Sequence, residues 1–495
     1  MSTNLRPLWP YLRKYRWPLF LGALTVFGNN GIWVLFPQVL RRAVDDLNHG
    51  ATRHKFMIYA LLLLAIAATK GIFQFLTRWI VIGVSREIEY DLRNDMFRHL
   101  ESLNYSYYQK NRTGDIMARA TNDLNAVRML LGPAIMYTAN TLVFTVAALA
   151  FMWHISPRLT IYAFLPLPLA SIVIQYFGRK IHERFERIQA QFSDISARAQ
   201  ENFSGARLIR AYVQEDPEIA LFEKSNREYV ERSLPLARLM GMLWPALELL
   251  LGLAIALVLW LGPRMVLRGD IKTVGEFYAF YTYIIMLTWP VIALGWVVNI
   301  FQRGTASMGR INEILTARPE ITDEHVAPDL REVETIRGTV EFRHLNFSYN
   351  GTQVLKDINL EIPAGSSLAI VGPTGAGKTT LVSLIPRVFE GRHEENGNGG
   401  GNSGSLLIDG RPIREYPLAV LRRNIGFVPQ ETFLFSDTVR ENIAFGVDKA
   451  TDEQVHDAAE AASIAADIES FPEQYQTMVG ERGITLSGGQ KQRTA

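Results

Sequence analysis

The residues with the clearest chemical pattern form a glycine-rich stretch, GPTGAGKT, at positions 372–379. Glycines let backbone N–H groups converge on phosphate oxygens, and the start of a helix adds a favourable dipole. Lys378 supplies a positive charge for phosphate, and the Thr379 hydroxyl can ligate Mg²⁺. The stretch follows an apolar run, SSLAIVG, that predicts a strand, and it precedes a run that favours a helix, KTTLVSLIPRVF. This context is typical of a P-loop, and a chance match in a glycine-rich turn is the alternative. The candidate nucleotide-phosphate-binding residues here are Gly372, Pro373, Thr374, Gly375, Ala376, Gly377, Lys378, Thr379 and Thr380.

A second glycine-containing segment, LSGGQKQRTA, occupies positions 486–495. Ser487, Gly488 and Gly489 would present a hydroxyl and two unobstructed N–H groups at the start of a helix. That arrangement predicts a second phosphate contact. A glycine-rich helix cap without a ligand is the alternative.

Composition excludes several other kinds of chemistry. The chain has 495 residues and no cysteine, which rules out disulfides, thiolate zinc sites, iron–sulfur clusters and cysteine nucleophiles. Lys and Arg number 51 against 49 Asp and Glu, so the net charge of +2 gives no electrostatic argument for nucleic-acid binding.

Apolar runs dominate the first 300 or so residues and are long enough to cross a bilayer. Buried helices of a large soluble protein are the alternative. Six spans are expected: Trp17–Leu40, Phe56–Ile82, Gly132–Trp153, Leu159–Phe177, Leu239–Leu261 and Phe277–Phe301. Before them, a basic and aromatic N-terminal segment predicts a short helix on the membrane surface. Its arginines and lysine place that end in the cytoplasm by the positive-inside rule.

The segments between spans alternate between short and long. Those at 83–131 and 178–238 are long, charged and periodic at three or four residues, so we expect the membrane helices to continue far into the cytoplasm. Each contains a break, around Gly114 and around Pro217, where two long helices could turn through a short crosswise helix. Such elbows are natural contact points for another domain.

The domain boundaries follow from changes in composition. Residues 1–317 form the expected membrane domain, and residues 318–337 form a polar linker that contains Pro319 and Pro328. Residues 338–495 form a domain in which predicted strands, loops and helices alternate. The patch at 394–405 is rich in Gly, Asn and Ser and predicts a disordered surface insertion.

Together these features resemble the ATP-binding cassette exporters of the half-transporter kind. Besides the P-loop, the resemblance rests on LSGGQ at 486–490, VGERG at 479–483, FVPQETFLFSDTVRENIAFG around Gln430, and Tyr349 in FSY. It implies that Tyr349 stacks on adenine, that Gln430 reaches Mg²⁺ and couples to the membrane domain, and that VGERG contacts the crossing loops. The implied ligands are ATP and Mg²⁺, with Thr379 and Gln430 at the metal.

The resemblance also implies a dimer. In the family, the signature motif acts on the ATP held by the partner's P-loop, so Ser487, Gly488, Gly489 and Gln490 would serve a second half-transporter, identical or different. The expected fold is an α-helical six-span membrane domain fused to an α/β P-loop nucleotide-binding domain.

The implied function is ATP-driven export of amphipathic drug-like or lipid-like molecules across a bacterial inner membrane, with the nucleotide domain in the cytoplasm. A catalytically inactive supporting subunit of a heterodimer is the alternative. In the family, the carboxylates that position metal and water follow the signature helix. We therefore expect residues 1–495 to be an incomplete form that contains no catalytic residue of its own and hydrolyses almost no ATP.

Ionisable side chains inside the expected spans form a further set. Lys70, Arg78 and Glu248 are costly in lipid, so they should face protein or a wet cavity. Three asparagines could line the same cavity: Asn29, Asn30 and Asn140. Substrate contact, buried pairing, snorkelling and helix–helix hydrogen bonds all remain open for these residues.

Overall fold

The structure is a computed structural model, and it describes residues 4–495 except 49, 51, 350–351, 391–403, 431, 448 and 481–485. The chain divides into two compact units. The helical unit comprises Met1–Arg98 and Ile116–Leu315, and the second unit comprises His99–Asp115 and Thr316–Ala495. The observed fold is a unit of long helices followed by a unit with a small sheet, which agrees with the predicted fold class.

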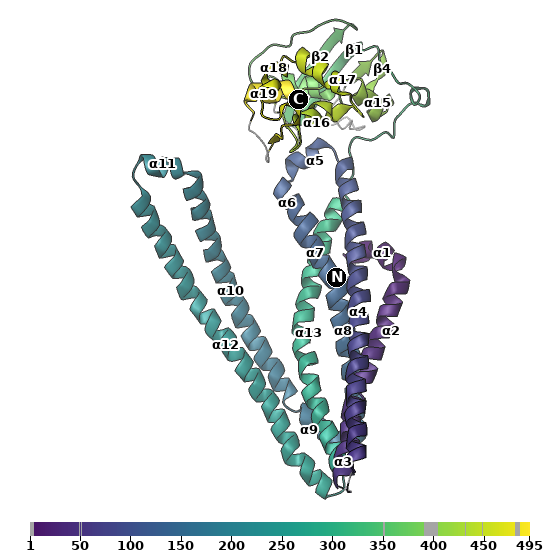
Figure 1. Ribbon diagram of the computed structural model, residues 1–495. Helices are drawn as coiled ribbons and strands as arrows, with labels where there is room; N and C mark the ends of the chain where they lie inside the picture. The colour runs from purple at the N-terminus through teal and green to yellow at the C-terminus, as the bar shows by residue number, and fades with distance from the viewer. Residues whose placement is uncertain are drawn as a thin grey trace. The chain divides into compact units, whose positions relative to one another are not determined.

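The first unit is built from long helices joined by short turns (Figure 1). Its α-helices are α1 (Trp9–Lys14), α2 (Arg16–Trp33), α3 (Phe36–Asn48), α4 (Arg53–Ser102), α6 (Thr113–Ala118), α7 (Leu124–Met129), α8 (Ile135–Ile155), α9 (Pro157–Phe164), α10 (Leu167–Ser204), α11 (Ala206–Ala211), α12 (Glu215–Leu267) and α13 (Val274–Leu315). Two π-helical segments, η2 (Arg119–Asp123) and η3 (Leu130–Ala134), flank α7. At 50 residues, α4 is about 75 Å long, which exceeds twice the hydrocarbon thickness of a bilayer.

Five helical stretches in the described residues are long and apolar enough to cross a membrane. They are Arg16–Leu47, Arg53–Ser102, Thr113–Ile155, Glu215–Leu267 and Val274–Leu315. The fourth expected span, Leu159–Phe177, is not among them because α9 ends at Phe164 and α10 begins at Leu167. Pro166 lies in that turn, and proline has no N–H to offer a continuous helix.

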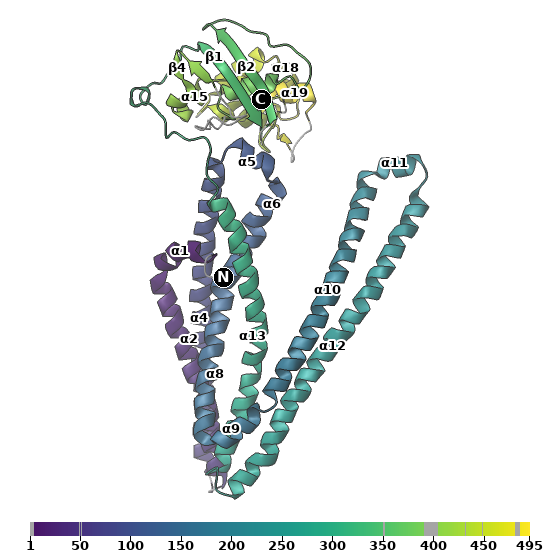
Figure 2. The same cartoon turned by 180° about the vertical axis from the view of Figure 1, so that it is seen from behind.

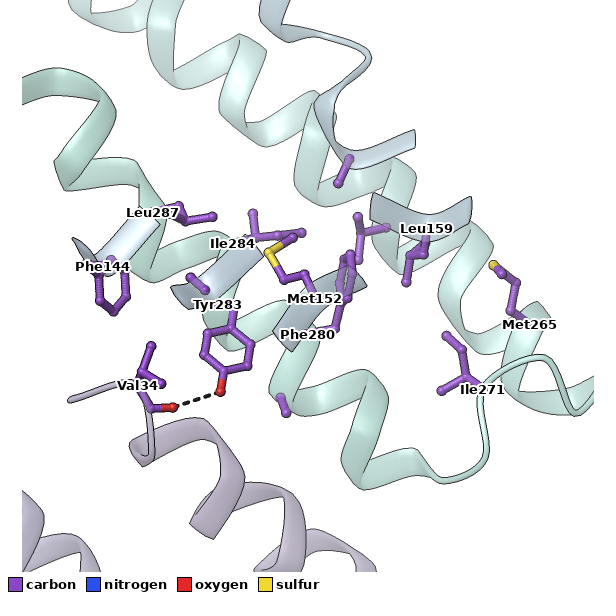
Figure 3. Close-up of a cluster of buried hydrophobic side chains, with 14 residues drawn as sticks. Val34, Phe144, Met152, Leu159, Met265, Ile271, Phe280, Tyr283, Ile284 and Leu287 are labelled. Atoms are coloured by element: carbon purple, nitrogen blue, oxygen red, sulfur yellow. Dashed lines mark hydrogen bonds between the residues drawn. The ribbon is translucent and has the colours of Figure 1, made fainter. Parts of the chain in front are cut away.

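A dry core joins the ends of several helices in this unit. Figure 3 shows Met152 of α8, Leu159 of α9 and Phe280 of α13 packed together. The Tyr283 hydroxyl of α13 points away from them and donates to the carbonyl oxygen of Val34 at 2.8 Å. Because an unpaired buried hydroxyl would cost about 1–3 kcal/mol, this bond fixes the end of α2 against α13.

The N-terminal helix α1 is short, as predicted, and polar contacts attach it to α4. Tyr11 donates to Asp95 at 2.7 Å, and Lys14 pairs with Asp91 at 2.6 Å. Burial, and then the hydrogen bond to Asp95, raise the pKa of the Tyr11 phenol, so it remains a donor at neutral pH.

Helices α10 and α12 form a long antiparallel hairpin that α11 closes, and both views show them side by side (Figures 1 and 2). The chain breaks at Gly205 and again between Tyr212 and Gln214, and the second break lies ahead of Pro217 but within the stretch YVQEDPEIALF in which it was expected. Pro217 lies in the first turn of α12, where a missing N–H costs nothing because that group has no intrahelical partner.

The first elbow also lies earlier than predicted. α4 ends at Ser102, α5 spans Tyr105–Lys110, and α6 begins at Thr113. Gly114 is thus the second residue of a helix, and a glycine near a helix end is tolerated. The signal that the prediction missed is Asn104, a residue type favoured at helix starts, which precedes α5 with extended backbone.

A buried carboxylate connects η2 to α13. Asp123 accepts from the guanidinium of Arg310 at 2.8 Å and from the hydroxyl of Ser307 at 2.9 Å. Its side chain is only 13% exposed, so these donors compensate the cost of burying its charge.

The second unit contains one antiparallel sheet with strand order β2-β1-β3-β4. The strands are β1 (Val340–Tyr349), β2 (Thr352–Ile362), β3 (Ser405–Ile408) and β4 (Arg411–Pro412). Helix α14 (Lys378–Leu384) buries Leu381 and Leu384 against the cluster that contains Phe342 and Phe347 of β1. The surface insertion predicted at 394–405 lies outside the described residues up to position 403, and β3 begins at its last residue.

The strand predicted before the P-loop is wrong. Residues 366–372 have no strand conformation, and Val371 is 88% exposed. A strand is stable only when a neighbouring backbone accepts and donates its hydrogen bonds, and in the described part of the sheet no strand lies beside this segment.

Residues 316–337 pack against this unit. Leu330 is buried in its core, Asp329 pairs with Arg411 at 2.6 Å, and the N–H of Ala327 donates to Glu415 O at 3.0 Å. A separate helical part comprises α16 (Val439–Ile443), α17 (Asp452–Ala461), α18 (Ala465–Glu469) and α19 (Gly488–Thr494), with its own apolar cluster around Val439, Ile464 and Leu486. Helix α15 (Leu418–Arg423) belongs to the sheet cluster through its buried Leu421.

Replacement of Asp123 by Ala should lower the free energy of unfolding by about 1–3 kcal/mol, because it leaves Arg310 and Ser307 without their acceptor. The measurement is thermal unfolding of the purified protein in detergent. The control is Glu223→Ala, which removes an exposed ion pair with Arg227 and should cost at most about 0.5 kcal/mol. Equal losses would contradict a stabilising role for the buried contact.

Candidate nucleotide-binding site

The P-loop has a backbone that only glycine adopts easily. Gly375 and Gly377 have φ of +84° and +86°, and α14 begins directly afterwards at Lys378. Residues 372–376 are exposed. Pro373 has no N–H, and that of Ala376 donates to Pro373 O at 3.3 Å, so Gly372, Thr374 and Gly375 offer the N–H groups open to a ligand. A Cβ on Gly377 would lie 2.9 Å from Leu355, a buried residue of β2, so the close approach of loop and sheet also requires glycine here.

The Lys378 side chain folds back over the loop. Its Nζ donates to the carbonyl oxygens of Gly372 and Pro373, both at 2.8 Å. The ammonium is thereby held at the concave side of the loop, where a phosphate oxygen could replace a carbonyl as its acceptor. The hydroxyl-bearing side chain of Thr379 is exposed in the same first turn.

Tyr349 ends β1 and lies next to the P-loop helix. Its hydroxyl donates to Thr380 Oγ1 at 3.4 Å. Its ring makes edge contacts with Phe347 and Phe389, at centroid distances of 4.8 and 5.1 Å. Because two rings and one hydroxyl fix it, the half-buried Tyr349 ring is a rigid platform on which a flat base could stack.

The first elbow contacts the same aromatic group. The ring of Tyr105 in α5 lies 5.6 Å from that of Phe389, and Asn104 donates to Glu320 at 3.0 Å. A short path of rings therefore runs from α5 through Phe389 to Tyr349. The sequence analysis missed Phe389 and Tyr105, for which the aromatic run YSYY in the elbow was the available signal.

Gln430 and the VGERG segment make no contact with the P-loop among the hydrogen bonds of the described residues. Gln430 is exposed, and in the described residues no hydrogen bond joins it to the P-loop. Val479 is buried and donates its N–H to Asp437 O at 2.9 Å, which attaches VGERG to the segment that follows Gln430. Positions 481–483 of VGERG lie outside the described residues.

The signature segment starts a helix. Ser487 is the N-cap of α19, its Oγ accepts from the Gln490 N–H at 3.3 Å, and Gln490 Oε1 accepts from the Ser487 N–H at 3.0 Å. Gly488 and Gly489 are exposed, and no described atom lies within 4 Å of a Cβ added to either. Two N–H groups of the first turn therefore face open space, where an anion could accept from them.

The P-loop and the signature segment belong to different parts of the unit. Leu381 and Leu384 anchor the P-loop helix in the sheet cluster, whereas Leu486 anchors the signature in the helical cluster. No hydrogen bond within the described residues joins Ser487–Gln490 to positions 372–380.

The helical unit contains a second candidate site. A cavity of about 230 Å³ is lined by five of the six polar residues singled out inside the expected spans, namely Asn29, Asn30, Lys70, Arg78 and Asn140. Both Asn29 and Asn30 donate to Asn140 Oδ1, at 3.2 and 2.9 Å. Glu248 does not line this cavity and is exposed on α12.

Replacement of Gly377 by Ala should lower the melting temperature of the ligand-free protein more than replacement of Gly375 by Ala. Both substitutions place alanine at a left-handed φ, at a cost of about 1–2 kcal/mol, but only the substitution at position 377 would also displace Leu355. Thermal unfolding without nucleotide measures the difference. Identical melting temperatures would show that loop and sheet are not in contact.

Comparison with known proteins agrees with this geometry. The family model described as "ABC transporter transmembrane region" matches residues 19–291, and the model described as "ABC transporter" matches residues 355–495.

Relatives match along the whole chain. It is 35% identical to a probable multidrug resistance ABC transporter ATP-binding/permease protein (YheI) of Bacillus subtilis, over 100% of this chain and 82% of the relative. It is 34% identical to a multidrug resistance-like ATP-binding protein (MdlA) of Escherichia coli, over 98% of this chain and 80% of the relative. It is 31% identical to an ATP-dependent lipid A-core flippase of Desulfotalea psychrophila, over 99% of this chain and 83% of the relative. The chain therefore belongs to the ATP-binding cassette transporter family and is an exporter half-transporter, with one transmembrane region and one ATP-binding region on the same polypeptide.

Proposed function

We propose that this protein is an ATP-driven exporter of amphipathic molecules, drug-like or lipid-like, that works as a dimer in a bacterial inner membrane with its nucleotide domain in the cytoplasm. Family membership and the names of the relatives, multidrug proteins and lipid A-core flippases, support the substrate class. One observation supports the dimer. The P-loop and the signature are anchored in different apolar clusters, and both are exposed to solvent.

In this proposal, ATP binds at the P-loop. The backbone N–H groups of Gly372 and of residues 374–377, together with the Lys378 ammonium, hold the phosphates, and Tyr349 stacks on adenine. Thr380 keeps Tyr349 in place through its hydroxyl. Thr379 and Gln430 would supply a hydroxyl and an amide oxygen to Mg²⁺, which prefers such hard oxygen ligands, and both side chains are exposed.

The signature of each chain would complete the site of the other. Ser487 and the N–H groups of Gly488 and Gly489 would contact the γ-phosphate bound by the partner's P-loop, and Gln490 keeps Ser487 positioned through the reciprocal cap. Closure of the two nucleotide-binding domains around two ATP molecules would then bury charges that neither chain can bury alone.

The elbows would transmit this closure to the membrane helices. α5 contacts Phe389 beside Tyr349, so it is well placed to sense nucleotide. At the second elbow, Phe203, Tyr212 and Val213 are 82%, 70% and 78% exposed, which is unusual for large apolar side chains in a cluster. We propose that α11 docks on the nucleotide-binding domain of the partner, which would cover them.

The relatives named above are not described as supporting subunits, so they lend nothing to the alternative of an inactive partner in a heterodimer. The low ATP turnover expected of residues 1–495 alone stays a prediction, and phosphate release by that purified polypeptide is its measurement.

Mixed dimers test whether each ATP site is shared between two chains. Two differently tagged versions of an ATPase-active form of the transporter, one with Lys378→Ala and one with Ser487→Ala, are co-expressed and the mixed dimer is purified through both tags. A shared site predicts that this dimer keeps one intact site and close to half of the wild-type ATPase activity. The matched control pairs a wild-type chain with a chain that carries both substitutions, which damages both shared sites and should abolish activity.

The opposite result would contradict the proposal. If P-loop and signature of one chain formed the site, the first dimer would be inactive and the control dimer would keep half of the activity. Both homodimers of the single variants should be inactive in either case, which verifies that each substitution disables a site.

A further inference from the structure

Within the described part of the chain, the cavity in the helical unit is lined by positive charges only. It is lined by Lys70 and Arg78, and among the described residues that line it none carries a carboxylate. We propose that this cavity binds the anionic group of an amphipathic organic anion, with Lys70 as the primary contact and Arg78 as the second. The inference rests on the proposed export function and names the charge class of its substrate.

Lys70 is held in the cavity without a counter-ion. Its Nζ lies 3.4 Å from the centre of the Trp33 ring, and no ion pair or hydrogen bond joins it to another residue in the described part of the chain. A charged side chain inside a membrane-spanning helix is costly unless it faces protein or a water-filled cavity. The contact with Trp33 offsets part of this cost and leaves the ammonium protons free to donate to a ligand.

A polar stripe on α4 extends the site beyond one residue. Lys70, Gln74, Thr77 and Arg78 all line the cavity and follow a spacing of four, three and one residues, which places them on one face of the helix. Helix α4 contains an 18-residue window of mean hydropathy 2.1, so polar side chains are exceptions in its membrane-spanning part. Packing alone would favour apolar residues at these positions.

The asparagines opposite this stripe are already hydrogen-bonded to one another. Asn140 accepts from both Asn29 and Asn30, and its own amide donates to Met136 O at 2.9 Å. Asn30 uses both of its amide N–H groups, on Val26 O and Asn140 Oδ1, whereas Asn29 and Asn140 each keep one, so the cationic side chains of α4 are the charged donors for an anion.

The other residues that line the cavity are mainly apolar or aromatic and match the apolar part of such a ligand. Phe144, Met286 and Trp289 line the cavity beside Tyr137, whose ring packs on Trp296 at 5.1 Å. A ligand with one anionic end and one apolar or aromatic end would meet a matching surface at both ends, whereas a cationic amphiphile would meet two like charges.

The test uses the purified transporter in nanodiscs of phosphatidylcholine and a matched pair of probes, dansyl-labelled undecanoic acid and its neutral methyl ester. Fluorescence titration gives the dissociation constants. The acid should bind at least about tenfold more tightly than the ester, since one charge-assisted contact is worth that factor or more. Lys70→Gln should remove this preference and leave ester binding unchanged, and Lys70→Arg should retain the preference.

Arg264 provides the matched control. It also lies over a tryptophan ring, Trp260, at 4.5 Å, but it does not line the cavity. Arg264→Gln should leave both dissociation constants unchanged. Equal binding of acid and ester to the wild type, or a preference that survives Lys70→Gln, would overturn the inference.

Failure of the proposed function would look different. If the transporter exports the ester with ATP and Lys70→Gln has no effect on either probe, only the anion preference is wrong. If no amphiphile of either charge is exported or stimulates ATPase activity, the export function itself is wrong.

A change of lipid then identifies the source of the anion. With phosphatidylglycerol in place of phosphatidylcholine, loss of acid binding would show that the anionic lipid headgroup occupies the Lys70 site. Retention of acid binding would show that the site selects a smaller organic anion over the membrane lipid. Both results support the anionic site, provided that Lys70→Gln removes the binding that is seen.

Discussion

Inside a hydrocarbon layer, every backbone N–H and C=O group has to find its partner within the protein, because no water is available. An α-helix satisfies this requirement within a single segment, and it is what makes α4, α12 and α13 long and continuous. The same continuity carries each helix well beyond the membrane thickness. The turns at α5 and α11 are thereby moved out of the hydrocarbon layer, and only there can side chains such as Tyr105 be exposed for contact with a nucleotide-binding domain.

The helical scaffold also explains why polar groups in the spans gather where they do. Asp123, Tyr283 and Asn140 each find hydrogen-bond partners on another helix, so they fix helices against one another. Lys70 and Arg78 have no such partner among the described residues, and they lie at a cavity instead. The structure thus separates polar residues that hold the bundle together from polar residues that remain available for a ligand.

In the second unit, the P-loop and the signature segment share one structural feature. Both place free N–H groups at the start of a short helix. Gly377 brings the P-loop close to β2, whereas Ser487 and Gln490 cap α19 reciprocally and leave the glycines open. Each segment is anchored in its own apolar cluster, and no hydrogen bond in the described part of the chain joins the two.

The sequence by itself determined the features that depend on local chemistry. The glycines and Lys378 of the P-loop, the cap at Ser487, the long apolar helices and the two-part organisation all follow from residue types at short spacing. Tertiary structure decided the features that depend on distant partners. Residues 366–372 form no strand because no neighbour in the described sheet pairs with them, although their composition favours one. Contacts between segments far apart in the chain decided three further features, which local spacing does not encode. They are the elbows at Tyr105 and Gly205, the path of rings through Phe389, and the separation of Lys70 from Glu248.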